Sequence, residues 1–237
     1  MPLLVTGTIG IDTVQTPDAE AAGVSGGSCA YFAAAAAFHH NPIRIVGAVG
    51  GDWPDEHASL LSSIDGLCLD GLERREESKT FAWGGRYFDN MNQRETLFTE
   101  LGVLEEDPPA IPESYSDSRL IFLANSHPSI QLDLLNKFPK RKLAVADTMD
   151  LWIDIARDEL LTLFKEIDGV ILRTAKLSNN VLKQSKKLQI IARHGVGYDN
   201  VDIDYLNNNK IALGITGTAN AVSVAEHVMT MFLYLTK

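Results

Sequence analysis

The stretch Asp168-Gly169-Val170-Ile171-Leu172-Arg173-Thr174 decides the fold of this chain, because it contains a short apolar run without polar alternation, followed by polar residues. Runs without polar alternation suit strands that are covered on both faces. Similar runs occur at Leu3–Val5, Ile43–Val49, Leu120–Leu123, Leu143–Val145, Leu188–Ala192 and Ile211–Leu213. Helix-length segments separate them, so we expect an α/β fold: a doubly wound, mainly parallel sheet in a three-layer α/β/α arrangement with right-handed crossovers.

A different pattern occupies residues 80–101, where polar, aromatic and β-prone residues replace the apolar runs. This stretch predicts a small antiparallel excursion from the main sheet. Glu105-Glu106-Asp107-Pro108-Pro109 follows and predicts a stiff, solvated connector, because consecutive prolines can join neither a helix nor a central strand.

The composition is that of an ordinary globular protein: 237 residues, of which 45% are hydrophobic and 22% charged. This size fits one large domain or two small ones. The formal net charge of −10 and the isoelectric point near 5.0 argue against nucleic acid or an anionic membrane as a partner, since both require a basic surface.

The two cysteines, Cys29 and Cys68, are too few for a disulfide framework and lack the spacing of a metal site, so we expect both to be reduced and buried. Met1–Val5 leads directly into an apolar strand without the features of a signal peptide. No apolar run reaches the roughly 18 to 20 residues of a membrane span. We therefore expect a cytoplasmic protein.

Asp12 follows the first apolar run, at the place where an open α/β sheet presents its ligand crevice. A carboxylate there can accept two hydrogen bonds from a vicinal diol. Alternatively, Asp12 belongs to a turn or a helix cap.

A double glycine, Gly26-Gly27, precedes a predicted helix that contains five successive alanines, Ala33–Ala37. The alanines let the helix lie close to the sheet, and glycines let backbone N–H groups approach a ligand. Close packing explains the alanines but not the double glycine before them.

The order of these features, together with Val46-Gly47-Ala48-Val49-Gly50-Gly51-Asp52, resembles the amino-terminal half of ribokinase-like (PfkB-type) carbohydrate kinases. The resemblance covers residues 1 to about 167. Lys79–Tyr87 is similar to the lid strands of that family, and Ile121–Asn125 and Ala144–Thr148 are similar to two of its core strands.

The resemblance implies that Asp12, Gly26 and Gly27 hold the hydroxyl groups of a sugar, with Asn92 and Arg94 contributed by the lid. Tyr31 stands where many of these kinases have Asn, which leaves the sugar open. An aromatic residue there fits either a nucleoside-like ligand or a packed position in the core.

Phosphoryl transfer also needs groups that hold ATP with magnesium and a base for the attacking hydroxyl. The kinases resembled supply them through an Asn/Glu motif and a Gly-Ala-Gly-Asp stretch. Neither occurs here, since Gly169–Leu172 is followed by Arg173-Thr174-Ala175-Lys176. We therefore expect no cofactor for this chain alone, whereas a working kinase would use ATP and magnesium.

Asp168–Thr174, Leu188–Asp202 and Thr216–His227 resemble the D-2-hydroxyacid dehydrogenases, particularly their phosphoglycerate-dehydrogenase-like branch. The resemblance implies a second possible anion site. In it, the backbone N–H groups of Gly195, Val196 and Gly197 would bind a substrate carboxylate beside Arg173. Alternatively, the glycines form only a tight turn between a strand and a helix.

Gly195-Val196-Gly197 is not a dinucleotide fingerprint, because Asn200 occupies the third glycine position and no acidic residue ends a following strand. The resemblance places the true fingerprint and the catalytic residues in a cofactor domain that would begin beyond Lys237. NAD would therefore require a partner, and neither His194 nor His227 is assigned as a catalytic acid.

Ser223 and Glu226 have the spacing of a capping box, which predicts a helix from Val224 onward. Its apolar residues surround much of its circumference: Val224, Val228, Met229, Met231, Phe232, Leu233 and Leu235. The helix either packs onto the kinase-like half or leaves an apolar patch for self-association. A homo-oligomer would form through this helix or through the lid.

We therefore interpret the chain as a chimeric α/β protein. Residues 1–167 form a ribokinase-like substrate-binding half with a lid at about residues 80–101, and residues 168–237 form a dehydrogenase-derived βαβ segment that completes the same sheet. This interpretation predicts binding of a sugar or nucleoside, with neither complete catalytic machinery nor a metal site. Two alternatives stay open: a carbohydrate kinase, and a hydroxyacid-binding fragment of an NAD-dependent dehydrogenase.

Overall fold

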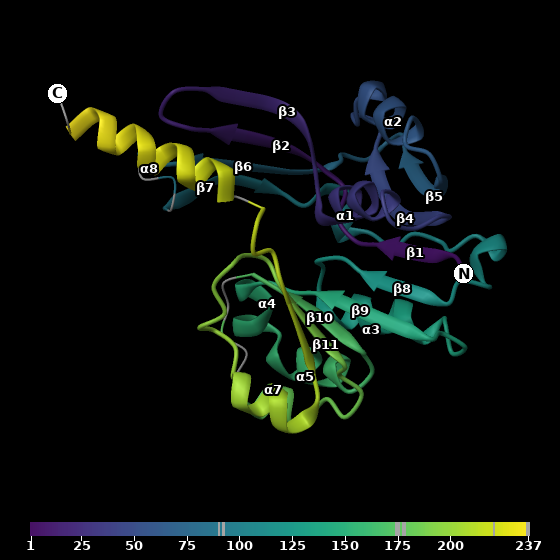
Figure 1. Cartoon of the computed structure of the whole chain (residues 1–237). Coiled ribbons are helices and arrows are strands. Elements are labelled where there is room, and N and C mark those ends of the chain that lie inside the picture. Colours follow the sequence, from purple (N-terminus) through teal and green to yellow (C-terminus); the bar gives the residue numbers. More distant parts are fainter. Residues whose placement is uncertain (90, 92, 174–175, 177–178, 220, 236–237) are drawn as a thin grey trace. The chain divides into compact units, whose positions relative to one another are not determined.

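The computed structural model describes residues 1–89, 91, 93–173, 176, 179–219 and 221–235 (Figure 1). The side chains of residues 150, 151, 179, 224, 227 and 232–235 are outside that description. The chain divides into two compact units, Met1–Asp147 and Thr148–Lys237. This division comes earlier than the change of family resemblance near Asp168.

Five parallel strands form the main sheet of the first unit, in the order β9-β8-β1-β4-β5. Their bounds are β1 (Leu3–Thr6), β4 (Ile43–Gly50), β5 (Leu67–Arg75), β8 (Leu120–Leu123) and β9 (Leu143–Asp147). Four of them were predicted from apolar runs. The exception is β5, which ends the order. Its apolar residues are interrupted by Asp70 and followed by three charged residues, so it lacks the continuous apolar signal of a strand covered on both faces.

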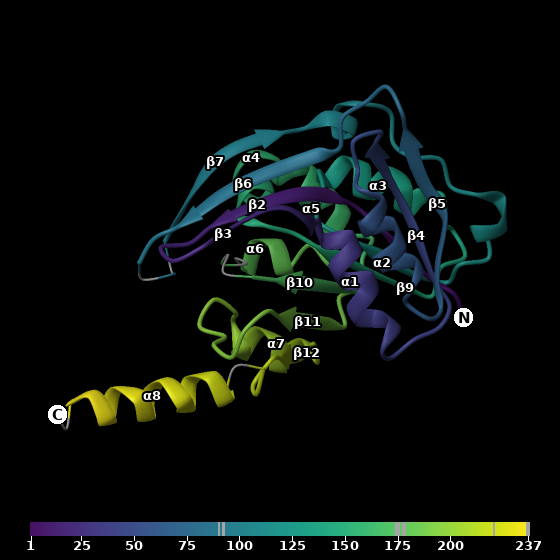
Figure 2. The same cartoon turned by 90° about the horizontal axis from the view of Figure 1, so that it is seen from above.

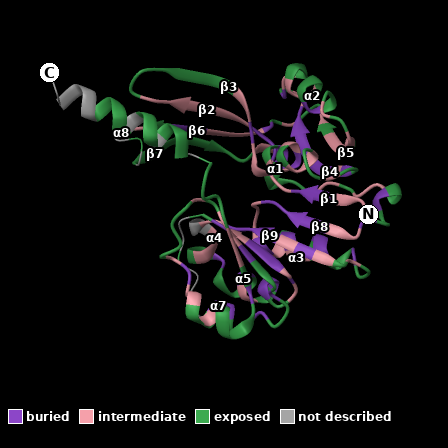
Figure 3. Cartoon of the chain, viewed as in Figure 1, coloured by how far each residue is buried: buried purple, intermediate pink, exposed green. Residues whose placement is uncertain are grey.

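Helices flank these strands (Figure 2): α1 (Ser28–Ala37), α2 (Asp55–Ser62) and α3 (Pro128–Asn136), with short 3-10 helices η1 (Gly102–Glu105) and η2 (Glu113–Tyr115). Figure 3 shows the buried segments in β1, β4 and β8, where Val5, Ile45 and Leu123 are fully buried. On α1, Phe32 stacks on Phe122 of β8 with the ring centroids 3.4 Å apart. The mainly parallel α/β fold with flanking helices is therefore confirmed.

The first unit also contains a four-stranded sheet in the order β3-β2-β6-β7. Its strands are β2 (Gly10–Gln15), β3 (Glu20–Gly26), β6 (Phe81–Tyr87) and β7 (Arg94–Glu100). The antiparallel pair β6–β7 is the predicted excursion, but β2 pairs with β6 in parallel, so the sheet is mixed.

The hairpin β2–β3 was not predicted, and it changes the placement of Asp12 and Gly26. Asp12 lies inside β2 rather than in a turn after the first strand, and Gly26 ends β3 rather than beginning a free loop. The Ala, Gly and Ser residues of β3 have low strand propensity, so pairing with β2 decides its conformation.

Two smaller predictions for the first unit were wrong in part. Cys29 is a buried free thiol, whereas Cys68 is only half-buried. Glu105 belongs to η1 rather than to the connector, and Glu106 forms an ion pair with Arg75 although residues 105–108 are exposed.

The second unit has three parallel strands in the order β12-β11-β10, all predicted from the sequence. They are β10 (Gly169–Leu172), β11 (Ile190–Arg193) and β12 (Ala212–Ile215). The helices are α4 (Asp150–Ile155), α5 (Arg157–Phe164), α6 (Asn179–Leu182), α7 (Ile203–Asn209) and α8 (Ala221–Leu235).

The predicted carboxy-terminal helix is present as α8, but its start was wrong. The helix already includes Ala221, so Ser223 lies within its first turn and is not the N-cap residue of a capping box. Val222 is 70% exposed and Met229 60%. In the part of the chain that is described, no helix has both the length and the apolar character needed to cross a bilayer.

Candidate functional site

The Asp12 carboxylate is half-buried on β2. No described residue donates a hydrogen bond to it. Partial burial raises the pKa of this carboxyl above its usual value, because removing water disfavours the charged form. An acceptor that has lost part of its hydration without gaining a protein donor is suited to receive hydroxyl donors from a ligand.

The structure brings Asp12 and Gly26 together. A Cβ at Gly26 would lie less than 3.0 Å from the Asp12 carboxyl group, so only glycine leaves room for that carboxyl. Gly27 precedes α1 with a φ of 94°, and a Cβ there would meet the backbone of Thr8 and Ile9. Gly26 therefore makes room for a candidate ligand group, whereas Gly27 allows close packing of the backbone.

Ser28, the first residue of α1, was missed as a candidate. Its Oγ is buried and has no hydrogen-bond partner among the described residues. Such an atom normally has a partner, so an unsatisfied hydroxyl two residues after Gly26 indicates a second polar group near Asp12 that a ligand can satisfy. A serine after a double glycine was the available signal, but the sequence does not show whether its hydroxyl is buried.

The lid contributes a residue that was also missed. Trp83 on β6 is the direct register partner of Asp12 on β2. The Arg94 guanidinium carbon lies 5.3 Å from the centroid of a ring of Trp83, within the range of a cation–π interaction. Asn92, the other predicted lid residue, lies outside the described residues.

Tyr31 is not a packed residue of the core. Its side chain is 65% exposed, and its hydroxyl donates a hydrogen bond to the Ser25 carbonyl at 3.0 Å. The core alternative for Tyr31 is therefore excluded, because this residue lies on the outer face of α1, whereas the buried face carries Cys29, Ala30 and Ala33.

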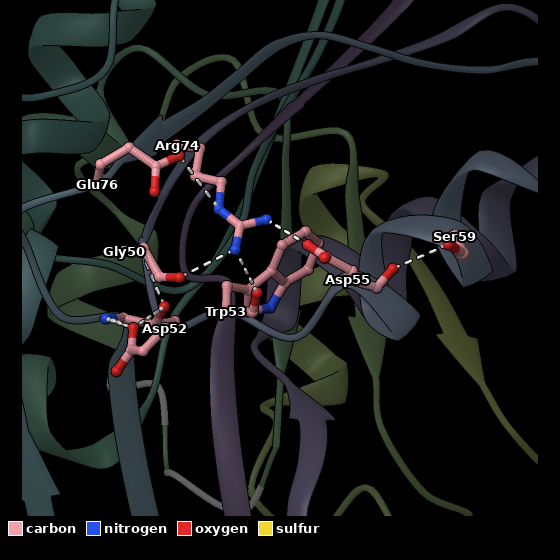
Figure 4. A network of polar contacts seen from close by, with 9 residues as sticks. Gly50, Asp52, Trp53, Asp55, Ser59, Arg74 and Glu76 are labelled. Carbon is pink, nitrogen blue, oxygen red and sulfur yellow. Dashed lines mark hydrogen bonds and ion pairs between the residues drawn. The ribbon is translucent and has the colours of Figure 1, made fainter.

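A polar network fixes the base of the four-stranded sheet (Figure 4). Asp52, in the loop after β4, accepts hydrogen bonds from Thr80 N at 2.7 Å and Thr80 Oγ1 at 2.9 Å. Burial opposes ionisation of Asp52, but the Thr80 hydrogen bonds and nearby Lys79 outweigh it and lower the pKa of the carboxyl. Thr80 Oγ1 in turn accepts a hydrogen bond from Gly50 N, so three residues join β4 to the start of β6.

Arg74 of β5 holds the same loop from the other side (Figure 4). Its guanidinium donates to the carbonyl of Gly51 at 2.9 Å, to the carbonyl of Trp53 at 3.1 Å and to the carboxylate of Asp55 at 2.6 Å. This network positions the sheet that carries Asp12 and Trp83 but offers no unpaired charge to a ligand.

The second predicted site lies in the second unit, after β10 and β11. Asn200 donates to the carbonyl of Arg173 at 3.3 Å and accepts from Nε of Arg193 at 3.3 Å, so it links the ends of both strands. The linker Gly195–Gly197 follows β11, and a Cβ at exposed Gly197 would find its nearest atom at 3.6 Å. The loop is therefore open at Gly197, where its shape leaves room for a ligand beside the backbone. Gly195, with a φ of 139°, is crowded, because an added Cβ would lie less than 3.0 Å from the Arg193 guanidinium.

The described residues after β11 do not form a dinucleotide-binding loop. A dinucleotide loop leads straight into a helix whose free N-terminus binds pyrophosphate. Here α7 begins at Ile203, and the Asp202 carboxylate already accepts from Tyr205 N at 2.8 Å. No cluster of three or more His, Cys, Asp or Glu side chains able to hold a metal ion occurs among the described residues.

The catalytic domain of the D-isomer specific 2-hydroxyacid dehydrogenase family matches residues 121–236. D-3-phosphoglycerate dehydrogenase from Mycobacterium tuberculosis is 36% identical over 98 residues, which are 40% of this chain and 19% of that protein. Hydroxypyruvate reductase from Thermotoga maritima is 36% identical over 80 residues, 33% of this chain and 26% of that protein. The chain therefore spans only a minor part of these relatives, and the family match begins well before Asp168.

The fold is similar to solved kinase structures. A nucleoside kinase from Methanocaldococcus jannaschii, described as an archaeal member of the ribokinase family, gives a TM-score of 0.60 at 15% identity. That similarity covers 90% of this chain and 69% of the kinase. Fructokinase from Xylella fastidiosa gives a TM-score of 0.63 at 17% identity, covering 82% of this chain and 70% of that one. Both resemblances are thus confirmed: residues 121–236 match the D-isomer specific 2-hydroxyacid dehydrogenase family, and the fold is similar to that of solved ribokinase-family kinases.

Proposed function

We propose that this chain is a chimeric α/β protein that binds a sugar or a nucleoside at Asp12 without transferring a phosphoryl group. The half-buried Asp12 carboxylate, which has no described donor and lies against Gly26, carries the proposal. The buried Ser28 hydroxyl adds a second unsatisfied polar group two residues farther along.

The fold comparisons support a ligand of this class. One similar structure is a nucleoside kinase from Burkholderia thailandensis in complex with inosine, and another is a fructokinase. The chain spans about 70% of the length of these kinases, and the match of 90% of the chain to the archaeal kinase extends past residue 167. Because these 237 residues contain neither kinase motif, we propose binding rather than phosphorylation.

Isothermal titration calorimetry with ribose, fructose and inosine tests the proposal. Asp12→Asn removes the charge with little change in shape, and charge-assisted hydrogen bonds contribute about 1.5 to 3 kcal/mol each. We expect affinity to fall by roughly 10- to 150-fold. Asp18→Asn, in the exposed turn between β2 and β3, is the matched control. Equal affinities of parent and Asp12→Asn, or no binding of any probe, would reject the proposed function.

A hydroxyacid-binding role is a second candidate, favoured by the family match over residues 121–236 and the open loop at Gly197. We expect D-glycerate to shift the backbone amide NMR signals of Gly195–Gly197. Gly197→Val would block the loop without crowding the protein, because no atom lies within 3.4 Å of the added Cβ. Unshifted signals, or the same shifts in Gly197→Val, would exclude this site.

We further propose that α8 contacts a second copy of the chain. Val228, Met229 and Met231 are 44%, 60% and 52% exposed, and each apolar side chain gains about 1.5 to 3 kcal/mol when fully buried. Light scattering should show an oligomer that the Met229→Gln, Met231→Gln double variant dissociates. A monomeric parent would contradict this proposal and leave the Asp12 site unaffected.

A further inference from the structure

One face of the four-stranded sheet gathers Asp12 and Trp83. In a parallel pair, directly matched residues point to the same side of the sheet, and Asp12 of β2 is matched with Trp83 of β6. Residues two apart along a strand share a face, so Gly85 lies next to Trp83 on that side. This face also holds Gly26, whose missing Cβ makes room for the Asp12 carboxyl.

The Trp83 indole lies along β6, directly over Gly85. A Cβ at Gly85 would lie less than 3.0 Å from three atoms of the indole ring, so the ring occupies the volume of a side chain that glycine lacks. The indole therefore extends away from Asp12, towards the end of the strand where Tyr87 pairs with Arg94 of β7. Its orientation is fixed by packing against the strand itself.

At the far end of this indole lies a positive charge without a carboxylate partner. Arg94 contacts the Trp83 ring, and it makes no ion pair with a described residue. The other arginines of this sheet and its base are paired: Arg86 with Glu95 at 2.9 Å, Arg75 with Glu73 at 2.8 Å, and Arg74 with Asp55 at 2.6 Å. The chain has more carboxylates than basic side chains, with a net charge of −10, yet the contact described for the Arg94 guanidinium is with an aromatic ring.

We propose that the ligand of the Asp12 site is an anionic sugar or nucleoside, whose hydroxyls bind Asp12 and whose carboxylate or phosphate binds Arg94. The proposal rests on the proposed function and defines its ligand class. The Arg94 guanidinium contacts the indole over Gly85, which lies one strand away from Asp12 and two residues farther along. Neighbouring strands lie about 4.8 Å apart and two residues advance a strand by about 6.6 Å, so the Asp12 carboxylate and the Arg94 guanidinium are separated on the order of 10 Å. A sugar with a terminal acidic group spans that distance once its hydrogen bonds are included.

The test compares neutral and anionic forms of the same ligand by calorimetry: glucose with gluconate, ribose with ribose 5-phosphate, and inosine with inosine monophosphate. We expect at least one anionic form to bind about 10-fold more tightly or better than its neutral partner at low salt, with the difference reduced at high salt. A preference in the first pair alone identifies a carboxylate, and a preference in the phosphate pairs alone identifies a phosphate.

Variants separate the two ends of the site. Arg94→Gln should remove the preference for the anionic form over the neutral form, and Asp12→Asn should weaken both forms. Gly85→Ala displaces the indole without touching either charge, so it should also remove the preference. Arg86→Gln, whose guanidinium is already paired with Glu95, is the matched control and should change neither affinity.

The outcomes distinguish this inference from the proposed function. If neutral forms bind through Asp12 but no anionic form binds more tightly, only the anionic ligand class is overturned. The same holds if an anionic preference survives Arg94→Gln. If no form binds, the proposed function fails and this inference fails with it.

Discussion

The glycines near the two candidate sites have different surroundings, as Gly26-Gly27 and Gly197 show. In the first unit, added Cβ atoms at Gly26, Gly27 and Gly85 would each lie less than 3.0 Å from other protein atoms. In the second unit, Cβ atoms at Gly197 and Gly214 would have no neighbour nearer than 3.6 Å and 4.0 Å. Packing therefore requires glycine at Gly26, Gly27 and Gly85 but not at Gly197 or Gly214. Each unit also has an exception: an added Cβ at Gly195 would lie less than 3.0 Å from the Arg193 guanidinium, and one at Gly23 would meet no atom within 4 Å.

This difference shows what a glycine motif can mean in each unit. At Gly27, other atoms of the protein fill the space that a side chain would occupy, so packing alone explains the glycine. A ligand role there needs separate support, such as the Asp12 carboxylate that has no described donor. Where the space is empty, as at Gly197, packing does not explain the glycine, and close approach by a ligand is the proposal that the Gly197→Val experiment tests. The kinase-like and dehydrogenase-like motifs therefore require different tests.

The largest effect should come from Gly27→Ala, which we expect to lower the free energy of unfolding by about 2 to 4 kcal/mol. The substitution combines a positive φ with a clash against the backbone of Thr8 and Ile9, which cannot move easily. Urea denaturation followed by circular dichroism measures the loss. Gly23→Ala is the control, since its φ is 70° but nothing lies within 4 Å, so it should cost only about 1 kcal/mol. Equal losses in the two variants would show that packing at Gly27 is unimportant.

Asp52→Ala should have the next largest effect and lower the free energy of unfolding by about 1 to 2 kcal/mol, because buried Thr80 loses two hydrogen bonds. The folded-state pKa of Asp52 is lowered, so its contribution is present above the unfolded pKa near 3.8 and is lost as the pH falls through the folded value. Parent and variant should converge in acid. Glu95→Ala, in an exposed pair with Arg86, should cost less than about 0.5 kcal/mol. A difference that persists at low pH would exclude the ionised Asp52 as its source.

Asp12→Asn should have a smaller effect of opposite sign. The pKa of Asp12 is raised in the folded state, so its protonated form stabilises the fold below the unfolded pKa of 3.8, and this contribution is lost as the pH rises. The variant should therefore melt at a slightly higher temperature than the parent at neutral pH, and at the same temperature below pH 3.8. A lower melting temperature at neutral pH would mean that Asp12 has a stabilising protein partner and is not reserved for a ligand.

Gly197→Ala should have the smallest effect and change the free energy of unfolding by less than about 0.5 kcal/mol, because the added methyl enters open space. Urea denaturation under the conditions used for Gly27→Ala provides the comparison. A loss as large as that of Gly27→Ala would show that the loop is packed in solution and would remove the distinction between the two units.

The sequence was sufficient to predict the parallel strands of both units, because strands covered on both faces leave continuous apolar runs such as Ile43–Val49. It did not show β2, β3 or β5. These strands are half-exposed or rich in small residues, and their conformation depends on pairing partners. Pairing of Asp12 with Trp83 joins positions far apart in the chain, so local periodicity carries no trace of it.

The candidate site was also predictable only in part, because some of its residues lie in short local motifs and others are brought together by pairing between distant strands. Asp12 and Gly26 lie in motifs short enough to recognise, and the structure places them in contact. Whether these residues bind a ligand stays a prediction, as does the role of Arg94. The sequence left Tyr31 open between a ligand contact and a core position, because helical position alone does not reveal which face of α1 meets the sheet.

The close packing of the Trp83 indole against Gly85 predicts how these two positions vary among related proteins. An alanine at Gly85 would collide with the ring, and loss of the ring would leave the space over Gly85 unfilled. Phe98 and Gly84 form the same kind of pair between β7 and β6, since a Cβ at Gly84 would meet the phenyl ring. Each aromatic residue and its glycine should therefore be inherited together, and lineages that lose one member should have exchanged the other as well.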